Sequence, residues 1–142
     1  MHIDRLLTLA KQLSKKKNPR TFMMRQWAID EHGCITAACA GGEAALLPEF
    51  RKLGLELIKD LGHWHIRFEG KFNEYALARF FDITGRQSLT IFMPASYRSF
   101  SRIQVARRIK SMIRLEKTKG FAMMALKSPE PNLVTLYSQS TF

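Results

Sequence analysis

Four side chains near the middle of the chain have the chemistry of zinc ligands: Cys34, Cys39, His63 and His65. Structural zinc sites normally bring two closely spaced cysteines together on a turn. The Cys-x4-Cys spacing lies at the edge of that pattern, and on a helix it would place the two sulfurs about 140° apart. The sequence therefore predicts no metal and no cofactor. It leaves open whether these four residues converge in space.

The same cysteines have two further chemistries to consider. On a helix they would be separated by about 7.5 Å of rise, more than the roughly 7 Å between Cα atoms that a disulfide allows. Cys34 near a helix N-terminus could act as a thiolate nucleophile with a histidine, since such a position favours the charged form. We interpret both cysteines instead as small, buried apolar residues in a reducing compartment.

No other catalytic pattern stands out. The sequence contains no GxxxxGK[ST] or GxGxxG phosphate loop and no HExxH or GxSxG motif. Its acids are few and scattered, so no carboxylate pair for hydrolysis can be chosen. We therefore predict a protein that is not an enzyme, with an enzyme of unrecognised site as the weakest alternative.

Positive charge is the most prominent feature of the 142 residues, because 23 Lys and Arg against 12 Asp and Glu give a net charge of +11. Residues 1–20 carry six bases and one acid, and residues 98–119 carry eight bases and one acid, whereas residues 21–60 carry six acids and four bases. Clustered cations are the electrostatic footprint of a nucleic-acid partner or of an acidic protein.

The second basic stretch falls on the helix predicted over 101–118. Val105, Ala106, Ile109, Met112 and Ile113 form its apolar stripe, and four bases lie on a flank of that stripe. An ordinary solvated face is the alternative, but such faces mix both signs of charge. Tyr97 and Phe100, just before this helix, could either stack on bases or cover the core. The predicted contact residues are Lys15, Lys16, Lys17, Arg20, Arg98, Arg102, Arg107, Arg108, Lys110, Arg114, Lys117 and Lys119.

Hydrophobic periodicity predicts an α+β fold, predominantly helical, as a small single domain over residues 1–142 with one or two short β-hairpins. Helices are expected over 3–16, 36–47, 73–81, 85–92 and 101–118, with Lys15–Lys17 in the last turn of the first and Gly120 ending the last. The 36–47 helix, rich in small residues, is expected to be central and to let another element approach closely. Hairpins are expected at 55–59 with 63–68 and at 121–126 with 133–137.

No apolar run reaches the roughly 20 residues that a membrane-spanning helix needs. The first residues lack the basic-then-apolar order of a signal peptide. We therefore expect a cytoplasmic protein with no membrane partner.

Several segments resemble a family of uncharacterised small proteins carried by phages and prophages. The clearest is Phe22-x-Met24 and Trp27 followed by the run Cys34–Gly42, which is similar to an F-x-M-x-x-W segment before a CGTAACAxG-like core. Ile35 departs from the glycine usual there. Further segments follow in the family's order at Leu6–Ala10, Ala78–Ile83, Ile91–Tyr97 and Val105–Ile109.

The resemblance implies a phage or mobile-element setting, with no catalytic residues to transfer. Together with the charge, it leads us to expect an accessory protein that binds nucleic acid or a nucleoprotein complex through its basic surface. The alternative is an inhibitor of a host defence complex, such as an anti-CRISPR protein, that acts by protein–protein binding. The sequence does not identify the partner, distinguish DNA from RNA or give the oligomeric state.

Overall fold

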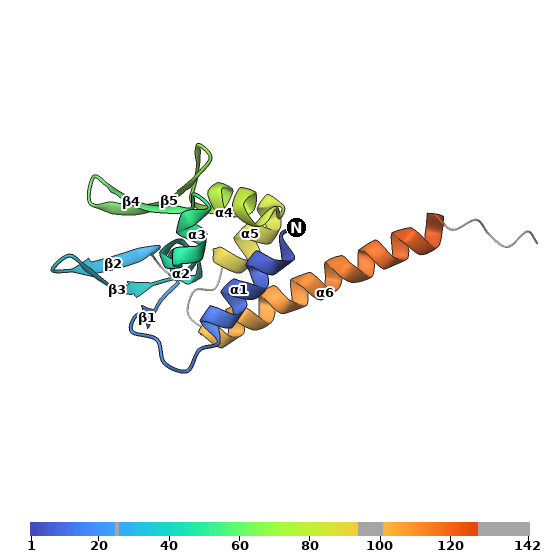
Figure 1. Cartoon of the computed structure of the whole chain (residues 1–142), viewed down its shortest axis with the longest axis horizontal. Coiled ribbons are helices and arrows are strands. Elements are labelled where there is room, and N and C mark those ends of the chain that lie inside the picture. Colours follow the sequence, from blue (N-terminus) through green and yellow to red (C-terminus); the bar gives the residue numbers. More distant parts are fainter. Residues whose placement is uncertain (25, 94–100, 128–142) are drawn as a thin grey trace, which may run out of the picture. The chain divides into compact units, whose positions relative to one another are not determined.

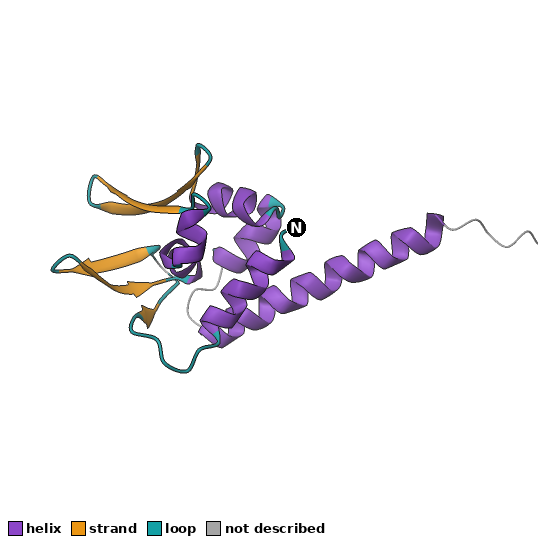
Figure 2. Cartoon of the chain, viewed as in Figure 1, coloured by secondary structure: helices purple, strands orange, loops and turns teal. Residues whose placement is uncertain are grey.

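The computed structural model of the chain describes residues 1–24, 26–93 and 101–127. The chain divides into two compact units, residues 1–112 and residues 113–142. The described residues form an α+β fold with six helices and two three-stranded sheets (Figures 1 and 2), so the predicted class is confirmed, although helix predominates only marginally.

The first unit contains every element except the later part of the last helix. Its helices are α1 (Ile3–Leu13), α2 (Ala40–Leu46), α3 (Pro48–Lys52), α4 (Asn73–Phe81) and α5 (Gly85–Phe92), and α6 (Arg102–Lys127) begins in it. Its strands are β1 (Thr21–Phe22), β2 (Ala28–Glu31), β3 (Cys34–Ala38), β4 (Glu56–Asp60), β5 (His63–Phe68) and β6 (Lys71–Phe72). The predictions of α4 and α5 are confirmed at both ends.

The two sheets are built on tight turns of one kind. In the first sheet β3 lies between β1, its parallel neighbour, and β2, its antiparallel neighbour; in the second, β5 lies between β4 and β6, antiparallel to both. Each antiparallel connection is a two-residue turn that ends in glycine, at 32–33, 61–62 and 69–70, and all six turn residues have positive φ. Two consecutive positive φ angles match the right-handed twist of the paired strands, which is why glycine follows each first turn residue. The predicted hairpin of β4 and β5 is confirmed.

The region of the small-residue helix differs from the prediction. Residues 34–38 form strand β3 rather than the first turn of a helix, because the 32–33 turn pairs them with β2. The helix itself begins only at Ala40 and is buried from Ala40 to Ala45, so its central position is confirmed. Pro48 then begins α3 at a first-turn position, where its missing N–H costs no hydrogen bond.

The core of the first unit is formed by five phenylalanine rings together with the apolar face of α1. The rings of Phe50, Phe68, Phe80, Phe81 and Phe92 meet with centroid separations of 4.9–5.8 Å, mostly edge to face. Such pairs add about 0.5–1.5 kcal/mol each beyond their buried area. Leu6, Leu9, Ala10 and Leu13 of α1 are buried as the helical spacing predicts.

Two helix ends were predicted wrongly. α1 ends at Leu13, three residues early, so Lys15–Lys17 follow the helix and lie outside its last turn. α6 continues through Gly120 to Lys127, because one glycine costs only about 1 kcal/mol in a helix interior and the residues after it are good helix formers. The predicted strand 121–126 is therefore helical, and its proposed partner 133–137 lies outside the described residues.

Candidate functional site

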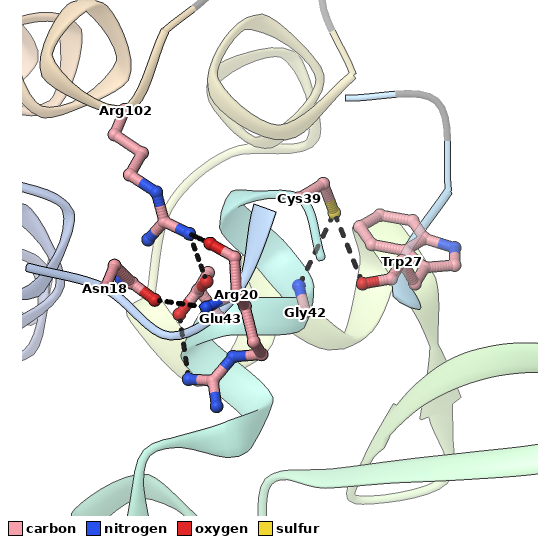
Figure 3. A network of polar contacts seen from close by, with 7 residues as sticks. All are labelled: Asn18, Arg20, Trp27, Cys39, Gly42, Glu43 and Arg102. Atoms are coloured by element: carbon pink, nitrogen blue, oxygen red, sulfur yellow. Dashed lines mark hydrogen bonds and ion pairs between the residues drawn. The ribbon is translucent and has the colours of Figure 1, made fainter. Parts of the chain in front are cut away.

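Among the described residues of the first unit, one carboxylate is fully buried: Glu43 on α2, which is 0% exposed. It lies between two guanidinium groups: Arg20 Nη2 donates to Glu43 Oε2 at 3.1 Å, and Arg102 Nη2 is 2.9 Å from Glu43 Oε1 (Figure 3). The arginine side chains are themselves only 22% and 13% exposed. Because an unpaired charge in such a position costs several kcal/mol, each of the three side chains depends on the others.

Further contacts tie the same arginines to the backbone. Arg102 also donates to the carbonyl oxygen of Arg20, and its guanidinium carbon lies 5.3 Å from the centre of the Phe22 ring. Asn18 Oδ1 accepts from the Arg20 backbone N–H at 3.2 Å. These contacts fix the segment 18–22 against the first residue of α6. We call Arg20, Glu43 and Arg102 the Glu43 brace.

The brace keeps a net charge of +1, since two guanidinium groups face one carboxylate. Three of the surrounding donor groups are buried and have no hydrogen-bond acceptor among the described residues: Asn18 Nδ2, Arg20 Nε and Arg102 Nη1. The junction between the two basic stretches is therefore itself positive.

The brace answers the question of whether the two basic stretches meet, because Arg20 belongs to the first and Arg102 to the second. Both of these predicted contact residues therefore form ion pairs within the protein, with Glu43. A third, Arg108, is exposed and donates to the carbonyl oxygen of Thr90 on α5 at 3.0 Å.

Five other predicted contact residues of the first unit point to solvent. Lys15, Lys16 and Lys17 are exposed on the segment after α1, and Arg107 and Lys110 are exposed on α6. No acid of the described part of the chain forms an ion pair with any of them. We call these five residues the basic surface.

Chain geometry limits how far apart these five residues can lie. Lys15 is five residues from Arg20, at most about 18 Å of extended chain. Lys110 is eight residues along the helix from Arg102, or about 12 Å. Because the brace joins Arg20 to Arg102, the Cα atoms of all five cations lie within about 20 Å of one point, so they span at most about 40 Å, or roughly 12 phosphates along one strand of a duplex.

The remaining predicted contact residues belong elsewhere. Arg114, Lys117 and Lys119 are exposed on the part of α6 that lies in the second unit, where Lys119 Nζ is 4.0 Å from Glu116. Arg98, with Tyr97 and Phe100, lies outside the described residues.

The four candidate zinc ligands do not form a group. Cys34 is exposed on β3, so the prediction that it is buried is wrong, and it does not lie near a helix N-terminus because α2 begins only at Ala40. Cys39 is buried and caps α2, where its Sγ accepts from the Gly42 N–H at 3.4 Å; burial raises the pKa of this thiol to about 11. His63 and His65 lie on β5 of the other sheet. Among the described residues, no three His, Cys, Asp or Glu side chains are placed to hold a metal ion.

Comparison with protein families, curated proteins and solved structures finds no match to this chain. The resemblance to phage-borne proteins therefore stays a prediction. In the part of the chain that the structure describes, none of the helices has the length and apolar character needed to cross a bilayer.

Proposed function

We propose that this chain binds nucleic acid through the basic surface, as a non-enzymatic accessory protein of a phage or other mobile element that acts in the host cytoplasm. One observation carries the proposal: the Glu43 brace joins the segment after α1 to the start of α6. The brace holds the two stretches that carry these cations next to each other, and the five cations have no acidic partners in the described residues, which supports one common binding surface.

The chemistry of this surface suits phosphate contacts. Lysine ammonium groups and an exposed arginine neutralise phosphates without reading bases, and each contact releases condensed counterions. Five contacts to duplex DNA would give a slope of about −4.5 in a plot of log K against log salt, or about 500-fold weaker binding at 200 mM than at 50 mM salt. We therefore propose binding that depends strongly on salt and weakly on sequence.

Salt titration of binding to a labelled duplex tests the proposal. Replacing Lys15, Lys16 and Lys17 together by alanine is expected to make the slope shallower by about 2.7, because three phosphate contacts are lost. A matched control replaces Arg51, Lys52 and Lys71, three exposed bases on α3 and β6, and removes the same net charge. The control is expected to leave the slope nearly unchanged.

Two results would contradict the proposal. Equal effects of the two triple variants would mean that net charge alone attracts the duplex and that no defined surface does. If neither DNA nor RNA binds, and a nuclease-treated pull-down from the host retains a tight protein partner, the alternative of a defence inhibitor acting by protein–protein contact would replace it.

A further inference from the structure

A hollow of about 290 Å³ lies between the two sheets of the first unit, and no residue of the brace lines it. Its walls come from the segment before and into β2, from the turn and first half of β5, and from the start of α4. The lining residues are Gln26, Trp27, Ala28, Gly62, His63, Trp64, His65 and Asn73. The chain has only two tryptophans, and both line this hollow.

The Trp64 indole is held in place by a contact that crosses from one sheet to the other. Its Nε1–H donates to Asp30 Oδ1 at 3.0 Å, and Lys59 Nζ lies 3.1 Å from the same oxygen and 5.6 Å from the centre of the indole ring. The hydrogen bond from the indole, followed by that from Lys59, lowers the pKa of Asp30 below its ordinary value. The carboxylate therefore stays charged and orients the ring.

Trp27 is fixed from the other side by the glycines of α2. A Cβ atom at Gly41 would lie 2.5 Å from the Trp27 ring, and one at Gly42 would lie 1.8 Å from the Trp27 carbonyl oxygen. The absence of side chains at these two positions allows α2 to pack directly on this tryptophan. This is the close approach that the small-residue segment predicted.

Asn73 determines which nitrogen of His65 carries the proton. Its Oδ1 accepts from the Ile66 backbone N–H at 3.0 Å, so its Nδ2 is the atom 3.3 Å from His65 Nδ1. Because an amide nitrogen only donates, His65 Nδ1 must accept, and the neutral ring then carries its proton on Nε2. Asn73 has a φ of 54°, which is uncommon for a residue with a side chain, so this orientation is held against a backbone cost.

We propose that this hollow binds one unpaired nucleobase. This proposal rests on the nucleic-acid binding proposed above. Indole rings stack on any base, and the Gln26 amide and the imidazoles supply donors and acceptors for a base edge. The volume of about 290 Å³ lies just below the roughly 300–1,000 Å³ of ligand sites, which suits one heterocycle and no larger ligand. The base can belong to a single-stranded nucleic acid or to a free mononucleotide.

Three probes distinguish these sources: a single-stranded DNA 12-mer, an abasic oligonucleotide with the same number of phosphates, and AMP. Tryptophan fluorescence is the readout, because both indoles are in the hollow. The 12-mer is expected to quench the emission and to bind more tightly than the abasic strand. Quenching by AMP alone would assign the hollow to a free nucleotide and count against the nucleic-acid proposal.

A variant tests the stacking directly. Trp64→Leu is expected to weaken 12-mer binding about 5- to 150-fold and to leave binding of the abasic strand unchanged. Tyr75→Leu, which removes an exposed ring on α4 outside the hollow, is the control. His63→Ala, at an exposed position of the lining, is a second variant that spares the sheet contacts, and it is expected to weaken 12-mer binding as well.

The outcomes separate this inference from the function on which it rests. If the 12-mer and the abasic strand bind equally and neither nucleic acid nor AMP quenches the tryptophans, the hollow is no base site, while loss of binding in the triple lysine variant would still support the basic surface. If no oligonucleotide binds and AMP does not quench, both proposals fail.

Discussion

Replacing Glu43 by glutamine should release much of what holds the two basic stretches together. The substitution keeps the size and shape of the side chain and removes its charge, leaving Arg20 and Arg102 facing each other at 22% and 13% exposure. Removing one partner of a buried ion pair costs about 3–5 kcal/mol. Both arginines retain some access to water and the amide oxygen can still accept one hydrogen bond, so we expect the lower end, about 3 kcal/mol.

Urea denaturation followed by circular dichroism measures this loss. With a slope of roughly 2 kcal/mol per molar urea, a loss of about 3 kcal/mol lowers the midpoint by about 1.5 M. Glu49→Gln, at an exposed position of α3, is the matched control and is expected to change the free energy of unfolding by less than about 0.5 kcal/mol. Equal midpoints for the two variants would refute the view that Glu43 braces the structure.

The same pair of variants tests whether the brace matters for binding. Both raise the net charge by one, so attraction by net charge alone would tighten duplex binding equally. We expect Glu43→Gln to bind more weakly than Glu49→Gln, because Lys15–Lys17 are no longer fixed near α6. Tighter binding by Glu43→Gln would mean that the arrangement of the cations does not matter.

Three further predictions concern single positions. Gly42→Ala should destabilise the protein by several kcal/mol or prevent folding, as measured by thermal unfolding, because its Cβ would lie 1.8 Å from the Trp27 carbonyl oxygen; a stable variant would mean that α2 can shift. Cys34 should react with a thiol reagent at pH 8 in the native state, whereas Cys39, whose pKa is raised to about 11 by burial, should react only after unfolding. Mass spectrometry identifies the labelled cysteine, and labelling of Cys39 in the folded protein would contradict this prediction. The pKa of Asp30 is lowered from 3.8, so the contribution of its charged form to the stability of the fold is complete above pH 3.8 and is lost as the pH falls through the lower pKa of the folded state. Tryptophan emission should change in that acidic range, because Asp30 accepts from the Trp64 indole. Asp30→Asn should remove the change.

The sequence predicts local structure well where a pattern is complete within a few residues. The ranges of α4 and α5 and the β4–β5 hairpin follow from periodicity and from one glycine turn. The prediction missed the pairing of Cys34–Ala38 with β2, because the alanines of this run favour a helix by propensity and the positive φ at His32 is not evident beforehand. Gly120 was given too much weight, since a helix with good formers on both sides tolerates a single glycine.

The candidate site was predictable in part. The excess of cations in two stretches is plain in the sequence, but their junction depends on a contact across 82 residues that no local pattern contains. One signal was present and went unused: Glu43 is the single charged residue between Ile35 and Leu47. Because this apolar segment is expected to be buried, its one acid would be buried with it. A buried carboxylate requires basic partners, which must come from elsewhere in the chain.

The acids of residues 21–60 therefore explain which cations remain available to bind a partner. Asp30 pairs with Lys59, Glu43 with two arginines and Glu56 with Arg67, so these acids bind bases within the fold. Counting charges along the sequence treats every base as equal, whereas folding distinguishes bases that hold elements together from bases that face solvent. Among the described residues of the first unit, the cations of the basic surface are left without acidic partners, and Glu43, the one acid of the brace, joins the two stretches that carry them. A substitution that changes these acids should therefore alter binding through geometry as well as through charge.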